Sequence, residues 1–131
     1  MGIKLRFYVV LIFIIPCLYA GSNESIFTSI QSNLERYRQS IATEDLKIEN
    51  GVIYLELLGR RTNHKSLLLL GYHSVGRSLQ KHNISLRQVK IMIHYEMKDI
   101  QQIVATATIE SVLSLSRGQM NPDQFFSEVR Y

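Results

Sequence analysis

Apolar residues recur at helical spacing in the segment from Ser25 to Ala42. Successive apolar positions are three or four residues apart, so they share one side of a helix, and charged or amide side chains occupy many of the positions between them. These apolar residues are Ile26, Ile30, Leu34, Tyr37 and Ile41. The pattern predicts an amphipathic helix that is capped at its N-terminus by Asn23 or Ser25.

Apolar and polar residues alternate over residues 46–57, which is the pattern of strands with one buried face. An Asn-Gly dipeptide at 50–51 divides the run. This dipeptide favours a two-residue hairpin turn, because both turn positions need a positive φ. Such a turn pairs Ile48 with Ile53. One face of the predicted hairpin is then apolar throughout, with Leu46, Ile48, Ile53, Leu55 and Leu57.

A second helix is predicted from Ser66 to about His82. Its apolar residues again follow helical spacing, at Leu68, Tyr72, Val75 and Leu79. Three small residues, Gly71, Ser74 and Ser78, also lie at helical spacing. They are expected to let this helix approach the sheet closely.

The same alternation predicts two further strands, from Gln88 to Glu96 and from Gln102 to Ile109. A three-residue loop over 98–100 pairs Tyr95 with Ile103. An odd loop length is required, because an even one would turn the polar residues of the second strand toward the apolar face.

The remaining residues predict two short helices. The first runs from Glu110 to Arg117 and stops at Gly118. The second begins at Asn121-Pro122, which suit the cap and the first helical position. The resulting order, α-β-β-α-β-β-α-α, predicts an α+β fold: a four-stranded, largely antiparallel sheet with helices packed on one face. No repeat or linker divides residues 21–131, so a single domain is expected.

Residues 1–20 have the pattern of a secretory signal peptide. Lys4 and Arg6 precede an apolar run, and Ala20 is a small residue at the point where the sequence turns polar. The run from Phe7 to Ala20 is shorter than the ~20 residues that cross a membrane as a helix. Cleavage after Ala20 is therefore expected, rather than retention of the segment as an anchor.

Cys17 is the single cysteine of the sequence, so the domain after the predicted cleavage site has no disulfide. An exported domain without disulfides is expected in a bacterial periplasm or at a cell surface. Lipidation of Cys17 stays open as an alternative, although Pro16 occupies the place of the small residue that precedes a lipid-modified cysteine.

The charge balance argues against one class of partner. The sequence has 15 Lys and Arg and 11 Asp and Glu, a net charge of +4, and loss of residues 1–20 lowers it to about +2. A nucleic-acid-binding domain carries a much heavier basic bias. Nucleic acid is therefore not expected as a partner.

The sequence carries no strong catalytic or metal-binding pattern. His64, His73 and His82 are nine residues apart, which turns a helix by about half a revolution, so they are not expected to share one ion, and His94 stands apart from them. Ser74 lies in a segment similar to Gly-x-Ser-x-Gly, but within a helical pattern rather than after a strand. We expect no metal, no cofactor and no enzymatic activity, and a small hydrolase is the least favoured function.

Two surfaces are candidate binding sites. Helices on one side of the sheet would leave the other side open, where the candidate partner surface is Tyr54, Met92, His94 and Val104. The second candidate is a basic loop before a helix N-terminus, formed by Arg60, Arg61, His64 and Lys65. The sequence therefore predicts an exported adaptor or binding domain that contacts an unidentified protein partner in the cell envelope. The alternative is a module that binds a lipid or another anionic ligand, at a membrane surface for example, through the basic loop.

Overall fold

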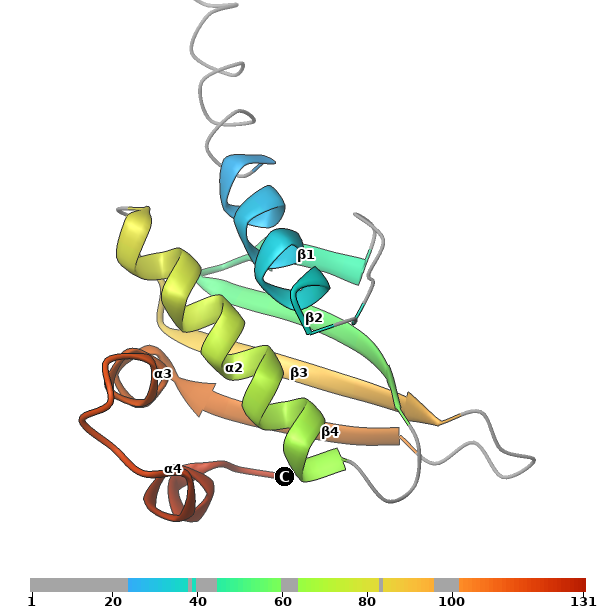
Figure 1. Ribbon diagram of the computed structural model, residues 1–131, viewed down its shortest axis with the longest axis vertical. Coiled ribbons are helices and arrows are strands. Elements are labelled where there is room, and N and C mark those ends of the chain that lie inside the picture. Colours follow the sequence, from blue (N-terminus) through green and yellow to red (C-terminus); the bar gives the residue numbers. More distant parts are fainter. Residues whose placement is uncertain (1–23, 38, 40–44, 60–63, 83, 96–101) are drawn as a thin grey trace, which may run out of the picture.

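The computed structural model describes residues 24–37, 39, 45–59, 64–82, 84–95 and 102–131. An N-terminal helix over residues 24–35 is followed by two strands, helix α2, two further strands and two short helices. Figure 1 shows the N-terminal helix and α2 side by side in front of the sheet, with α3 and α4 next to them. The predicted α+β fold and the order of its elements are confirmed.

The sheet has the strand order β1-β2-β3-β4, formed by β1 (Leu46–Glu49), β2 (Val52–Gly59), β3 (Gln88–Tyr95) and β4 (Gln102–Thr108). The two outer pairs are antiparallel, whereas β2 and β3 are parallel. Helix α2 (His64–Lys81) connects these two central strands across the front of the sheet. The sheet is therefore mixed, with antiparallel pairing at both sides of one parallel pair.

The first hairpin has the predicted register. Ile48 lies opposite Ile53, and the turn residues Asn50 and Gly51 have φ values of 53° and 77°. These positive φ values belong to the left-handed region that Asn and Gly tolerate best, so the dipeptide sets both the turn and the pairing.

The second hairpin has the predicted faces but a different register. Ile103 lies opposite Ile93 rather than Tyr95, a shift of two residues, and Ile91 pairs with Ala105. Side chains repeat every two residues along a strand, so a shift of two leaves the same residues facing the core. The predicted loop at 98–100 lies outside the described residues.

The helix ends differ in part from the expectation. The N-terminal helix stops at residue 35, so Tyr37 lies beyond it and its side chain is 55% exposed rather than part of the buried stripe. Helix α3 (Ile109–Ser116) begins one residue earlier than predicted, with the Thr108 hydroxyl accepting a hydrogen bond from the Ser111 amide. The predicted Asn121 cap of α4 (Pro122–Glu128) is confirmed, and Gln124 completes a capping box.

One core lies between the sheet and the helix layer. The apolar faces of the N-terminal helix, α2 and all four strands meet there, together with Phe125 of α4. Gly71 packs against the sheet, as predicted, because a Cβ at this position would lie 2.8 Å from the Ile91 side chain. Ser74 and Ser78 contact the N-terminal helix instead, where Asn33 forms hydrogen bonds with both.

Candidate functional site

The four residues of the predicted partner surface lie on the sheet face opposite the helices. Tyr54 is on β2, Met92 and His94 are on β3, and Val104 is on β4 directly opposite Met92. Each is half-buried, and each alternates along its strand with residues that point into the core or toward it. We call this surface, together with its neighbours Glu56, Leu58, Lys90 and Gln102, the open face.

Polar and apolar side chains of the open face contact one another. The Gln102 amide donates a hydrogen bond of 3.4 Å to the sulfur of Met92. The His94 Nε2 atom lies 3.7 Å from a carboxylate oxygen of Glu56. These contacts cross between neighbouring strands, so they align polar groups around the apolar side chains of the face, such as Met92 and Val104.

A cation also lies over the aromatic ring of this face. The Lys90 Nζ atom is 5.8 Å from the centroid of the Tyr54 ring, within the range of a cation–π contact. On β1, Lys47 forms an ion pair of 2.7 Å with Glu49, and this hydrogen bond raises the pKa of the Lys47 ammonium group. The positive charge of Lys90 therefore has an aromatic partner, whereas that of Lys47 has a carboxylate.

Leu58 belongs to the open face but was not among the predicted residues. It lies opposite His94 in the pairing of β2 with β3, and its side chain is 55% exposed. The signal in the sequence was the Leu57-Leu58 pair, because two adjacent leucines on a strand must point to opposite faces. This large exposed aliphatic side chain is diagonal to Met92 on the same face and widens the apolar part of the surface.

The basic loop is only partly described. Arg60 and Arg61 lie outside the described residues. His64 is the first residue of α2, and Lys65 follows it with an exposed side chain. The grouping of four basic residues therefore stays a prediction.

The candidate catalytic serine and the four histidines are spread through the fold. Ser74 is in the middle of α2 and 1% exposed, so it does not form a turn between a strand and a helix. His64 and His73 are on α2, His82 follows it, and His94 is on β3. Within the described part of the chain, no three His, Cys, Asp or Glu side chains gather where they could hold a metal ion.

None of the described helices has both the length and the apolar character needed to span a membrane.

Comparisons with known proteins return no family model, no curated protein and no solved structure that matches this chain.

Proposed function

We propose that this chain is an exported, non-catalytic binding domain that docks a protein partner of the periplasm or cell envelope on its open face. The segment over residues 1–20, with its basic start and apolar run, supports export. The side chains of the open face support docking. An apolar centre with a polar surround is the usual composition of a protein–protein interface.

The observation that carries the proposal is the continuity of the apolar centre across three strands. Met92 on β3 lies directly opposite Val104 on β4, and Leu58 on β2 lies opposite His94, diagonal to Met92 on the same face. The polar neighbours Glu56 and Gln102 are engaged with His94 and Met92. A partner can therefore cover this centre without stripping water from many unpaired polar groups.

The cation over Tyr54 adds a preference for the partner. Among the described residues, Lys90 has no carboxylate within ion-pair distance. A partner surface with apolar side chains and a neighbouring Asp or Glu would complement both Met92 and Lys90. The contact of Lys90 with the Tyr54 ring holds the Lys90 ammonium group near the edge of the apolar centre.

Photocrosslinking in the native host tests the proposal. A photoreactive amino acid that replaces Leu58 should form a discrete adduct with one protein. The same photoreactive amino acid in place of Gln119, which is also exposed, should form no such adduct. The combined Tyr54→Ala and Met92→Ala substitutions should remove that adduct and leave the melting curve nearly unchanged, because surface substitutions change stability by about 0.5 kcal/mol or less.

Two results would contradict the proposal. Equal adducts from Leu58 and Gln119 would mean that the open face makes no specific contact. An adduct that persists in the double variant would mean that Tyr54 and Met92 do not hold the partner.

A further inference from the structure

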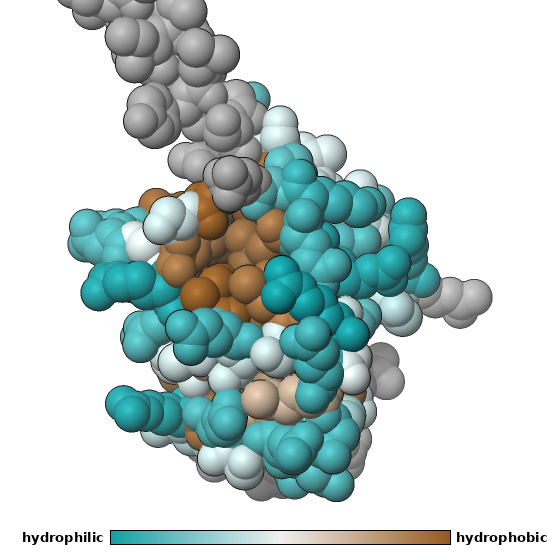
Figure 2. Space-filling view, turned by 90° about the vertical axis from the view of Figure 1, so that its left-hand side faces the viewer, coloured by the Kyte–Doolittle hydropathy of each residue, from teal (hydrophilic) through white to brown (hydrophobic). Residues whose placement is uncertain are grey.

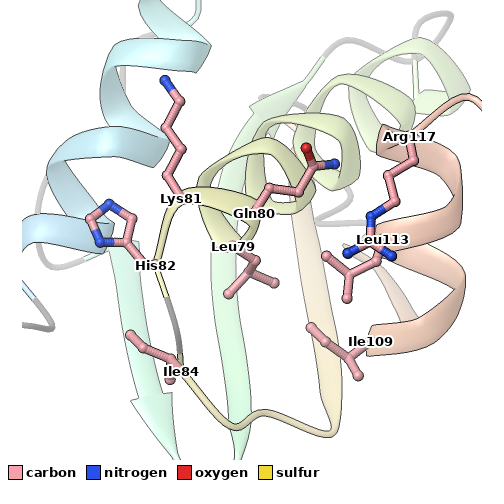
Figure 3. A pocket seen from close by; sticks show the side chains of 8 residues that line it. All are labelled: Leu79, Gln80, Lys81, His82, Ile84, Ile109, Leu113 and Arg117. Carbon is pink, nitrogen blue, oxygen red and sulfur yellow. The ribbon is translucent and has the colours of Figure 1, made fainter.

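A hollow of about 390 Å³ lies on the helix side of the molecule, between the C-terminal end of α2 and helix α3. Figure 2 shows a recessed apolar area on the left-hand side of the molecule as drawn in Figure 1, and Figure 3 shows the lining side chains of the hollow. The volume falls within the range of about 300–1,000 Å³ that is typical of small-molecule sites. The hollow is on the opposite side of the sheet from the open face.

The lower part of the hollow is aliphatic. Leu79 of α2, Ile84 of the connection to β3, and Ile109 and Leu113 of α3 line it. The last three pack against the core but stay partly exposed, so each offers apolar surface to the hollow. A bound apolar group would be stabilised by removing this surface from water.

The upper margin of the hollow is basic. Lys81, His82 and Arg117 belong to its lining, and no acidic residue of the described ranges does. Neither Lys81 nor Arg117 forms an ion pair with any residue of the described ranges. In Figure 3 the Arg117 guanidinium lies beside Leu113, while Lys81 extends from the last turn of α2 away from the aliphatic residues. An anionic group above the aliphatic residues would therefore meet Arg117 first.

One side-chain amide and three backbone amides around the hollow are already paired within the protein. The Gln80 side-chain amide donates a hydrogen bond of 2.7 Å to the Ser116 hydroxyl. The backbone amides of Ile84, Ile109 and Arg117 donate to the carbonyl oxygens of His82, Arg87 and Leu113. A peptide needs partners for its own backbone groups, whereas an acyl chain needs none. The lining therefore favours an acyl chain over a peptide.

We propose that this hollow binds a single-chain fatty carboxylate, with the acyl chain against Leu79, Ile84, Ile109 and Leu113 and the carboxylate beside Arg117. Arg is suited to this contact because its planar guanidinium donates two parallel hydrogen bonds to a carboxylate. The ligand site is independent of the protein partner on the open face, so either proposal can fail without the other.

Titration with dodecanoate below its micellar concentration, followed by amide resonances of the isotope-labelled protein, tests the assignment. Saturable shifts should be concentrated in residues 79–84 and 109–117. Dodecyltrimethylammonium, which has the same chain and a positive head, should bind at least about tenfold more weakly, a difference of about 1.4 kcal/mol.

Paired substitutions test the two parts of the site. Arg117→Gln should weaken dodecanoate binding at least about tenfold, and Arg77→Gln, another exposed arginine substitution, should not change it. Ile84→Asn should abolish binding, whereas Leu58→Asn on the open face should have no effect. Arg117→Glu, a change confined to an exposed side chain, keeps the test valid if Ile84→Asn does not fold.

Four results would overturn the assignment. The first is the absence of saturable binding. The second is equal binding of the anionic and cationic amphiphiles. The third is a set of shifts centred on a second hollow, which Tyr37, Leu70 and Met120 line. Binding of an acidic peptide to the α2–α3 hollow without binding of dodecanoate would also contradict the proposal.

Discussion

The side-chain amide of Asn33 donates a hydrogen bond of 3.0 Å to the hydroxyl of Ser78, across the buried contact between the N-terminal helix and α2. Asn33 is 8% exposed and Ser78 is fully buried. The Ser78 hydroxyl donates in turn to the Ser74 carbonyl at 2.9 Å, so the three residues form a small polar network inside an apolar layer.

Asn33→Ala should lower the free energy of unfolding by about 1–3 kcal/mol, because it removes a buried hydrogen bond and leaves a space. Ser78→Ala should also destabilise the protein, because it leaves the Asn33 amide without its main acceptor. Urea unfolding of both variants and of the double variant checks this. The double variant should lose less free energy of unfolding than the two single variants lose together. Strict additivity of the two losses would show that Asn33 and Ser78 are not coupled.

Gly76→Ala should be more destabilising than Gly71→Ala, although both glycines are buried on α2. A Cβ at Gly76 would lie 2.7 Å from the Ser116 Cβ and 2.9 Å from the Val112 carbonyl oxygen, so α2 and α3 would have to separate. At Gly71 the nearest atom, at 2.8 Å, is the terminal methyl carbon of Ile91, which can move. Overpacking of this kind costs about 1–3 kcal/mol, and thermal unfolding measures the difference. Equal losses at the two positions would contradict the close contact at Gly76.

Tyr72→Phe should leave stability unchanged or increase it by about 1 kcal/mol. The Tyr72 side chain is fully buried, and its hydroxyl has no hydrogen-bond partner within the described structure. Its ring packs edge-on against Phe125 at 5.0 Å, a contact that Phe keeps. Removal of an unpaired buried hydroxyl relieves a desolvation cost of about 1–3 kcal/mol, part of which the small space left behind offsets. Chemical denaturation measures the change, and a clear loss of stability would show that the hydroxyl has a partner.

Acidification should destabilise the protein in part through His73. Burial and the nearby Arg77 charge lower the pKa of His73 in the folded state, so the unfolded chain binds its proton more readily. The stability from the neutral form is present above the unfolded pKa of about 6.5 and is lost as the pH falls through the folded pKa. Melting temperatures between about pH 7.5 and 5 should therefore fall less for His73→Gln than for the unchanged protein, because other groups contribute equally to both. If the melting temperatures of the two proteins fall equally with pH, His73 does not contribute to the loss of stability in acid.

Leu55→Ala and Tyr54→Ala test the two faces of β2 at adjacent positions. Leu55 is fully buried against the helices, and its truncation should cost about 2–5 kcal/mol. Tyr54 is half-buried on the open face, so its truncation should have a much smaller effect. Denaturant midpoints compare the two, and a loss at Tyr54 as large as that at Leu55 would mean that the open face is covered.

The two hairpins show which parts of the fold the sequence determines locally. Asn50 and Gly51 restrict the first turn to two residues, and this restriction fixes the register of Ile48 with Ile53. The second hairpin has no comparable turn signal. Alternation alone is unchanged by a shift of two residues, so the pairing of Ile103 with Ile93 could not be predicted.

The open face and the α2–α3 hollow differ in how far the sequence predicts them, for a similar reason. Tyr54, Met92, His94 and Val104 could be assigned to one face, because alternation within each strand reports which side a residue takes. The α2–α3 hollow could not be predicted, because Ile84 and Leu113 come from segments that only the packing of α2 against α3 brings together. The predicted order of helices and strands likewise left the parallel pairing of β2 with β3 undetermined.

The backbone contact between Thr106 and Arg130 has a consequence for self-association. Thr106 donates to the Arg130 carbonyl at 2.8 Å and accepts from the Arg130 amide at 3.0 Å, on the side of β4 that faces away from β3. An unpaired strand edge invites pairing with another chain and thereby aggregation. Because a residue of the same chain occupies the middle of this edge, a strand from a second molecule would first have to displace Arg130.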